Sequence, residues 1–369
     1  MLDEALLKQD EQAVFTLRTL FRRYGYLPYK MSKFEEYDLY VRNKDFLVSD
    51  RIITFNDTNG RLLALKPDVT LSIIQSLDES KGGKRKVCYN ENVYRVSGAT
   101  KQFKEILQTG LECMGDIDLY DLYEVVYLAA HSLSLISNEF MLDLSHIGIL
   151  NGIFEEFGAD EAFRQAATGY LARKNDHDLH RLCAESAAPE GLRDALTALV
   201  RLSGDAQQVL PQLMPLCHAE SAKSALAELT QLCDALAQTP FAARIRLDFS
   251  IVNNMHYYNG VVFRGYLSGV CEGVLAGGQY DKLMQKMGKS GRAIGFAVYL
   301  DLLDSLQRPV QDYDVDTLVL YDETTGLRQL AEQVRNIASF GRSVRAEREA
   351  PAALRWRRIV DLRKEARSC

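Results

Sequence analysis

The sequence predicts an α+β fold in which a mixed, mainly antiparallel sheet is flanked by helices. Three observations predict it. Asn59-Gly60 lies between two apolar runs, which is a strong hairpin signal. Within residues 86–115, Val87, Tyr89 and Val93 predict one strand, and a partner strand is predicted at 103–112. Residues 158–240 are instead rich in Ala, Leu and Gln and poor in strand-forming residues, which predicts an insertion of several short helices.

Composition places the chain among globular proteins. Its 369 residues suggest two or three structural units, and 47% of them are hydrophobic and 25% charged. The net charge of −6 argues against broad nucleic-acid binding, and no uninterrupted apolar run approaches membrane-spanning length. The seven cysteines are scattered without a C-x-x-C pair, and the start of the chain is acidic. We therefore expect reduced thiols and a cytoplasmic location, with no signal peptide.

The first third of the chain predicts a helix followed by short strands. The helix covers residues 4–24 and ends at Gly25, and a strand follows at 26–29. Further strands are expected at 46–48, 52–56 and 62–65. A helix over 71–77 then follows Lys66-Pro67-Asp68-Val69-Thr70, where Asp68 or Thr70 could be no more than a helix N-cap.

Residues 86–115 predict two strands that carry an unusual polar face. Arg95 ends the first strand, beside a loop at 97–101. Gln108, Gly110 and Glu112 alternate in the second strand and so project to one face. A buried Gln and Glu would need hydrogen-bond partners. The alternative, a solvated strand face, is equally consistent with this pattern.

The middle of the chain predicts mostly structural elements. A helix over 120–135 follows an acidic stretch whose carboxylates suit its positive N-terminal end, a strand follows at 141–144 and a helix at 147–157. Within the insertion, His177 and His180 could lie one turn apart as a metal pair. Two solvated histidines are the favoured interpretation, so we expect no metal site. The insertion is expected to stand apart from the sheet.

Residues 249–302 carry the most informative pattern. The pattern predicts a hairpin in which a strand from Phe249 turns at residues 257–260 and resumes at 261–263. Gly277-Gly278 permits close backbone approach, and Gly295 is expected to end a short strand before an apolar helix. Tyr257 and Tyr258 could line a polar small-molecule pocket, although periodicity alone favours ordinary alternating strand residues. The main sheet is thus expected from 26–29, 46–65, 86–112, 141–144 and 244–298.

The end of the chain predicts a second, smaller unit. A core of residues 1–308 is followed by a short α/β-like extension over 309–369, with a strand at 315–321, a helix at 327–337 and a strand at 343–346. Residues 355–367, RWRRIVDLRKEAR, are basic and amphipathic. They could dock on a partner or fray, and the sequence does not decide between the two.

Three of these runs together resemble the centre of histidyl-tRNA synthetase, where R-G-L-D-Y-Y precedes G-G-R-Y-D and G-F-x-x-G-L-E-R. Here the runs read NNMHYY at 253–258, GGQYD at 277–281 and GFAVYLDL at 295–302. The resemblance spans roughly residues 5–157 and 244–306. It implies a class II aminoacyl-tRNA synthetase-like fold, with a homodimer formed through the first motif, the helix and strand of residues 4–29.

The same resemblance implies a site for free histidine. Arg95 would hold the carboxylate, while Asp68, Thr70 and Gln108 would accept from the amino group. Glu112 and Tyr258 would satisfy the imidazole nitrogens, with Tyr257 and Tyr280 as walls. The complete expected set is Asp68, Thr70, Arg95, Gln108, Glu112, Tyr257, Tyr258 and Tyr280.

Two arginines that carry the family's activation chemistry are replaced. Asn253 stands at the position of the catalytic arginine and Leu302 at that of an ATP-binding arginine, while Ser97 replaces an adenine-contacting glutamate. Phosphoryl chemistry needs such cations, so adenylate formation is expected to fail.

A histidine pocket without activation chemistry resembles the regulatory subunit family of short-form ATP phosphoribosyltransferase. That resemblance implies a non-catalytic, cofactor-free homodimer that binds short catalytic chains and reports histidine by feedback on histidine biosynthesis. The alternative is a divergent synthetase paralogue that activates histidine or a related acid. A tRNA-binding module is disfavoured by the acidic charge balance and the short C-terminal extension.

Overall fold

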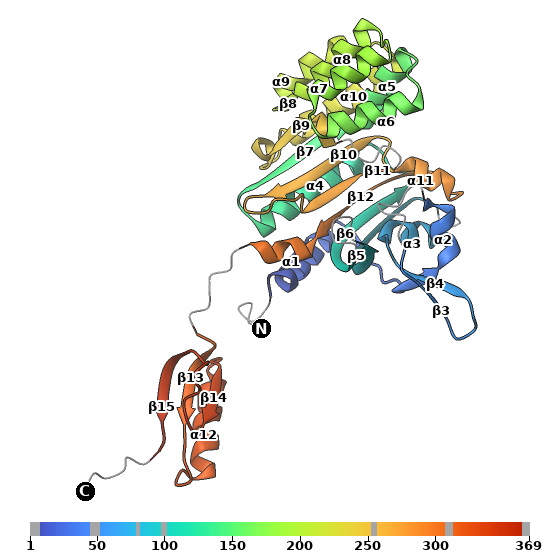
Figure 1. The fold of residues 1–369 in the computed structure, drawn as a ribbon. Helices are drawn as coiled ribbons and strands as arrows, with labels where there is room; N and C mark the ends of the chain where they lie inside the picture. The colour runs from blue at the N-terminus through green and yellow to red at the C-terminus, as the bar shows by residue number, and fades with distance from the viewer. Residues whose placement is uncertain are drawn as a thin grey trace. The chain divides into compact units, whose positions relative to one another are not determined.

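The computed structural model describes residues 8–44, 52–78, 82–96, 102–251, 257–306 and 313–363. The chain divides into two compact units, Met1–Leu306 and Gln307–Cys369 (Figure 1).

The first unit is built on a nine-stranded sheet. Its strand order is β1-β5-β6-β12-β11-β10-β7-β9-β8. The β1–β5 and β7–β9 pairs are parallel and the other pairs are antiparallel, so the expected mixed, mainly antiparallel sheet is confirmed. The strands are β1 (Leu27–Pro28), β5 (Lys84–Val96), β6 (Phe103–Gly115), β7 (Phe140–His146), β8 (Ser203–Gly204), β9 (Ile245–Asp248), β10 (Val261–Leu267), β11 (Leu275–Gln279) and β12 (Arg292–Tyr299).

The Asn59-Gly60 hairpin forms a separate small sheet. β4 (Leu62–Leu65) lies between β2 (Phe34–Glu36) and β3 (Thr54–Asn56), and Gly60 has the positive φ of 80° that this turn requires. The expectation that this stretch joins the main sheet is therefore wrong for residues 54–56 and 62–65, because in the described part of the chain β3 and β4 pair within this small sheet. β2 and the short helix α2 (Tyr37–Arg42) were not predicted, and the strand expected at 46–48 lies outside the described residues.

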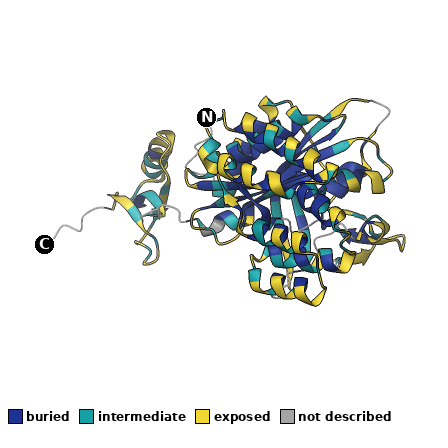
Figure 2. Cartoon of the chain, turned by 90° about the horizontal axis from the view of Figure 1, so that it is seen from above, coloured by how far each residue is buried: buried dark blue, intermediate teal, exposed yellow. Residues whose placement is uncertain are grey.

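Helices cover both faces of the main sheet. One hydrophobic core includes buried residues of α1 (Gln9–Arg23), α4 (Leu119–Ile136), α5 (Ile147–Glu156) and the 3-10 helix η7 (Leu300–Ser305). The other core joins α3 (Val69–Gln75) and α11 (Asp281–Lys286) to Val87 and Tyr89 of β5. Cys88, between them in sequence, belongs to the first core, because successive side chains of a strand face opposite ways. Figure 2 shows this buried interior as dark blue.

The helical insertion is present but does not stand apart from the sheet. It comprises α6 (Glu161–Ala172), α7 (Asp176–Glu185), α8 (Glu190–Arg201), α9 (Ala206–Leu213), the 3-10 helix η4 (Met214–Leu216) and α10 (Glu220–Leu236). Its buried leucines belong to the same core as α4 and α5, and β8 pairs with β9. The expectation of separation is wrong, because the buried residues of these helices belong to one core with residues of the strands β7 and β9. The helices lie at the β8–β9 end of the sheet (Figure 1).

Two expectations for residues 249–302 are also corrected. Residues 249 and 261–263 do not form a hairpin, because β7 lies between β9 and β10 and pairs with both. Phe249–Ile251 forms a 3-10 helix, η6, and not a strand. Gly295 does not end its strand either, since β12 continues to Tyr299 before η7 begins.

The C-terminal unit is a small α/β fold. β13 (Val315–Leu320) pairs in parallel with β14 (Val344–Glu347) and β15 (Trp356–Asp361), and α12 (Leu327–Ser339) connects the first two strands. The basic segment that the sequence left undecided therefore contains the third strand of this sheet. Among the helices of the described residues, none is long and apolar enough to cross a membrane.

Candidate functional site

A cavity of about 100 Å³ lies over the centre of the main sheet. All eight residues expected to contact histidine line it, although they come from distant parts of the chain. They are contributed by the loop and helix start after β4, by β5 and β6, by the turn before β10 and by the residue after β11. The remaining lining residues are Val69, Tyr89, Ala276, Gly295, Phe296, Ala297 and Tyr299.

Small residues make room for the cavity. Ala276, Ala297 and Gly110 are register partners across β11, β12 and β6, so they share one face of the sheet. A Cβ on Gly110 would overlap the Phe296 carbonyl, and one on Gly295 would overlap the Glu112 carboxylate. Side chains at the two glycines would displace Phe296, Tyr89 and Glu112, which line the cavity.

Glu112 is the central acidic group of the cavity. Its carboxylate accepts a hydrogen bond from Thr70 Oγ1 at 2.8 Å and one from Tyr280 OH at 2.5 Å. Burial raises the pKa of Glu112 to about 8, and the Asp68 charge adds to the rise while the two hydrogen bonds oppose it. Gln108 and Glu112 are only 4% and 2% exposed, so the alternative of a solvated strand face is wrong.

The chain preceding α3 is held in place by buried polar contacts. The Lys66 side chain is fully buried, and its Nζ lies 3.0 Å from Glu91 Oε2. The Lys66 carbonyl accepts a hydrogen bond from the backbone N–H of Tyr94 at 2.8 Å. Because both Glu91 and Tyr94 belong to β5, these contacts fix the distance between that strand and the residues that begin α3.

Asp68 caps α3 and also faces Arg95. Its Oδ1 accepts a hydrogen bond from the Leu71 N–H at 3.0 Å, so Asp68 is the N-cap of α3, but it is more than a cap because it also lines the cavity. Arg95 donates from Nε to the Pro67 carbonyl at 2.8 Å, and its Nη2 lies 3.9 Å from Asp68 Oδ2. Burial raises the pKa of Asp68, and the Arg95 charge opposes that rise. The cavity thus contains one cation, Arg95, beside the Asp68 carboxylate, whose charge this cation only partly neutralises.

Three tyrosines form a wall of the cavity. The rings of Tyr257 and Tyr258 lie 4.8 Å apart, and those of Tyr257 and Tyr280 lie 5.8 Å apart. Burial raises the pKa of all three phenols well above its usual range, so they are neutral donors at physiological pH. The interpretation of Tyr257 and Tyr258 as ordinary alternating strand residues is wrong, because both precede β10 and line the cavity.

Sequence reasoning missed two tyrosines of the lining. Tyr89 lies two residues after Val87 on β5, so their side chains share one face of the sheet. This spacing could have assigned Tyr89 to the face of the ligand site. Tyr299 is the register partner of Gln108, a relation that only the pairing of β12 with β6 reveals.

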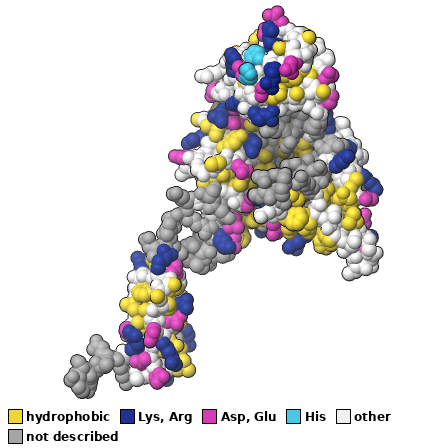
Figure 3. Space-filling view, in the orientation of Figure 1, with side chains coloured by type: hydrophobic (Ala, Val, Ile, Leu, Met, Phe, Trp, Pro, Cys, Tyr) yellow, Lys and Arg dark blue, Asp and Glu magenta, His cyan; other side chains and the backbone are white. Residues whose placement is uncertain are grey.

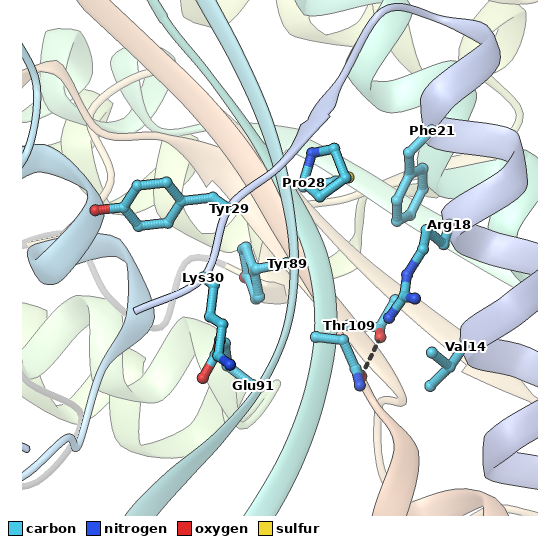
Figure 4. Close-up of a pocket in the computed structure, with 11 residues that line it drawn as sticks. Val14, Arg18, Phe21, Pro28, Tyr29, Lys30, Tyr89, Glu91 and Thr109 are labelled. Atoms are coloured by element: carbon cyan, nitrogen blue, oxygen red, sulfur yellow. Dashed lines mark hydrogen bonds between the residues drawn. The ribbon is translucent and has the colours of Figure 1, made fainter. Parts of the chain in front are cut away.

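A second hollow, of about 280 Å³, lies between α1 and the edge of the sheet (Figure 4). Its polar groups are largely satisfied or solvated: Thr109 donates to Asn90 at 2.7 Å, and Arg18 and Lys30 are exposed. Although it is larger, it offers no buried acid comparable with Glu112. The cavity over the centre of the sheet is therefore the better candidate for a small polar ligand.

Of the two positions at which the family's arginines are replaced, the structure describes one. Leu302 lies in η7 and packs against the first core. Asn253 and Ser97 lie outside the described residues. In the described part of the chain, His180 pairs with Asp176 at 3.2 Å, and no cluster of three His, Cys, Asp or Glu side chains could hold a metal ion.

The sheet, its flanking helices and the central cavity define a protein with the class II histidyl-tRNA synthetase fold. The sequence model of the family described as "Histidyl-tRNA synthetase" matches residues 2–303. A crystal structure titled as an ATP phosphoribosyltransferase regulatory subunit/histidyl-tRNA synthetase from Bacillus halodurans C superposes with a TM-score of 0.82 at 22% identity, covering 96% of this chain and 94% of that one. Identity this low supports the fold alone.

A curated relative is more specific. The ATP phosphoribosyltransferase regulatory subunit of Desulfitobacterium hafniense (strain Y51) is 31% identical over 296 residues, which cover 77% of this chain and 76% of the relative. The chain belongs to the family of ATP phosphoribosyltransferase regulatory subunits. A structure titled as the ATP phosphoribosyl transferase (HisG:HisZ) complex from Thermotoga maritima is also similar, with a TM-score of 0.62 at 18% identity over 79% of this chain and 97% of that one.

Burial of Glu112 predicts a pH-dependent free energy of unfolding. Its pKa is raised from 4.5 to about 8, so the folded protein retains a proton that the unfolded chain has released between these values. The contribution of Glu112 to stability is therefore complete below pH 4.5 and is lost as the pH rises through about 8. In urea unfolding, the free energy of unfolding of Glu112→Gln should rise relative to that of the wild type by a few kcal/mol as the pH increases from about 5 to about 8.5.

Glu105→Gln is the control for this experiment. Glu105 lies on the same strand but is exposed, where it accepts hydrogen bonds from Asn92 and Tyr94, so this substitution removes no buried carboxyl group. A constant difference between Glu112→Gln and wild type across the pH range would contradict the prediction.

Proposed function

We propose that this chain is the non-catalytic regulatory subunit of a short-form ATP phosphoribosyltransferase, and that the central cavity binds free histidine. The observation that carries the proposal is the meeting of all eight expected residues around one cavity with a buried acid. Family membership supports the role in the first step of histidine biosynthesis, since the curated relative bears the name of this regulatory subunit.

Each polar part of histidine has a chemical partner among these residues. Arg95 provides a guanidinium for the carboxylate, and Asp68 faces the same space as an acceptor for the amino group. Glu112 contacts the imidazole ring. A ring nitrogen carries a proton, and a buried carboxylate can accept a hydrogen bond from that N–H. Tyr258 supplies a second polar partner, and Tyr257 and Tyr280 exclude water from the ring.

Feedback requires more than binding. A ligand shifts an equilibrium only when its affinity differs between two states of the complex. We propose that histidine binds this chain with different affinity in the active and inhibited states of its complex with the short catalytic subunit. The complex works in the cytoplasm in this proposal, as biosynthesis from ATP requires.

Histidine binding should depend on Arg95 and Glu112. Arg95→Ala removes a charge-assisted contact and should cost about 1.5–3 kcal/mol, or roughly ten- to a hundredfold in affinity, measured by calorimetry. Glu112→Gln should reduce discrimination between histidine and other amino acids more than it reduces binding of the amino-acid backbone. Arg85→Ala is the matched control, because Arg85 lies on the same strand but donates to the Ser76 carbonyl outside the cavity.

The regulatory role is tested in the same variants with the catalytic partner present. Histidine titrations of phosphoribosyltransferase activity should shift to higher concentration for Arg95→Ala and Glu112→Gln and stay unchanged for Arg85→Ala. If inhibition by histidine is the same in the Arg95→Ala/Glu112→Gln double variant as in the wild type, this cavity is not the sensor.

We further propose that the chain does not activate histidine. Leu302 packs against the apolar core where the synthetases carry an ATP-binding arginine, and Asn253 replaces the other arginine. The pure protein should show no histidine-dependent exchange of pyrophosphate into ATP. Exchange above background that Arg95→Ala abolishes would instead support the alternative, a divergent synthetase paralogue.

A tRNA partner is not favoured by the surface charge. Lys and Arg side chains are interspersed with Asp and Glu on the face seen in Figure 3, and the chain carries a net charge of −6. Polyanions bind where one sign of charge accumulates.

We also propose a homodimer formed through α1 and β1. β1 is an edge strand of the main sheet, and it exposes 68% of Leu27, while Phe15 on α1 is 50% exposed. Large apolar side chains that are exposed in one chain are suited to burial against a second copy. Leu27→Asp should shift sedimentation from dimer to monomer, whereas Met214→Asp, at an equally exposed position in the insertion, should leave the dimer intact. A monomeric wild type, or a dimer insensitive to Leu27→Asp, would contradict this interface.

A further inference from the structure

Asp281 links two borders of the cavity. Its carboxylate accepts hydrogen bonds from Gln279 Nε2 at 2.5 Å, from Asn259 Nδ2 at 3.2 Å and from the Ala293 N–H at 2.9 Å. Asn259 directly follows Tyr258, and Tyr280 directly precedes Asp281 in the sequence. The carboxylate therefore holds the turn that carries Tyr258 beside the strand end that carries Tyr280.

A salt bridge connects Asp281 to the inserted helices. Arg292 Nε lies 3.6 Å from Asp281 Oδ2, and Arg292 Nη2 lies 3.3 Å from Glu228 Oε2 on α10. Glu228 Oε1 lies 3.1 Å from Nε2 of His146, which precedes α5. His146 Nδ1 accepts the Gly148 N–H at 3.0 Å, so Nε2 carries the ring proton and donates it to Glu228. The contacts form a continuous path from α5 and α10 to the cavity border.

The geometry makes Arg292 a bridge between Glu228 and Asp281. Asp281 Oδ2 receives the Asn259 and Gln279 amides and also faces Arg292 Nε. With Glu228 charged, the guanidinium is held between two carboxylates. Without that charge Arg292 loses one of the two groups that fix it, and the cation beside the oxygen that holds Asn259 is no longer held in place.

We propose that Glu228 is a positioning residue for the amino-acid cavity, acting through Arg292 and Asp281 on the Tyr257–Tyr258 turn. The inserted helices and the cavity are coupled by this path, so that a change in the packing of α10 changes ligand affinity, and ligand binding changes the packing of α10. The affinity part of this inference rests on the proposed histidine site, while the coupling itself does not.

Hydrogen exchange of the unliganded full chain tests the coupling without any ligand. Glu228→Gln keeps the shape of the side chain and an acceptor for His146 but removes the charge that holds Arg292. Amides in residues 257–262 and 279–283 should exchange several-fold faster in this variant. Glu220→Gln is the matched control, because Glu220 lies on the same helix and pairs only with the exposed Lys223 in the described structure. Its exchange in both segments should equal that of the wild type.

Calorimetry with histidine then tests the consequence for affinity. Glu228→Gln should weaken binding roughly three- to tenfold, and Glu220→Gln should not change it. Arg292→Gln should have an effect of the same size as Glu228→Gln, and the double variant should bind no more weakly than Arg292→Gln alone, since both residues act along one path. Arg292→Lys retains the cation and should recover most of the affinity lost in Arg292→Gln, a rescue that a general loss of packing would not produce.

The outcomes separate the two proposals. Unchanged exchange at 257–262 in Glu228→Gln, or independent and additive effects of the Glu228 and Arg292 substitutions, overturns the positioning role. If Glu228→Gln does not fold, Arg292→Gln is compared with Arg292→Lys instead. This comparison tests the positioning role at the partner of Glu228 in the salt bridge. If the wild type does not bind histidine, the proposed ligand is wrong, and the exchange experiment still decides whether α10 and the cavity are coupled.

Discussion

The buried carboxylate of Glu112 is the constraint on which the site depends. A carboxylate that is 2% exposed is unfavourable unless donors surround it, and here Thr70 and Tyr280 supply them. These two donors come from α3 and from the residue after β11, so the acid ties both elements to β6. Gly295 on the neighbouring strand leaves the space into which the carboxylate projects. The cavity is thus assembled around a carboxylate whose burial costs stability, which is typical of a group that serves a specific function.

Such a carboxylate is suited to recognising a proton-bearing ring. Burial raises the pKa of Glu112 and so disfavours its charged form, and a ligand that brings a proton donor or a positive charge would relieve that cost. Arg95 and Asp68 face each other in the same lining, so a bound amino acid would have its charged groups beside this pair and its side chain beside Glu112. The histidine site that we propose therefore does not involve the positions of the arginines that synthetases use for ATP.

The continuous core explains how remote helices can affect the cavity. The buried residues of α10 and α8 belong to one hydrophobic cluster with α4, α5 and the main sheet. Close-packed cores transmit displacement because few voids absorb it. The polar path through Glu228, Arg292 and Asp281 runs beside that core and ends at the residues bordering Tyr258 and Tyr280.

Local sequence patterns determined much of the fold and the chemical inventory of the site. Asn59-Gly60 specified a turn because few residue pairs adopt its backbone angles, and alternation placed Gln108, Gly110 and Glu112 on one face. Motif resemblance selected the eight residues that the structure brings to one cavity, although their contact with histidine stays a prediction. Only the tertiary structure decided strand order, which is why the expected hairpin at 249–263 was wrong: β7, more than a hundred residues earlier in the chain, lies between its two halves. Burial, register and the Glu228 path depend on contacts between segments far apart in sequence, and short-range periodicity carries no information about which segments will meet.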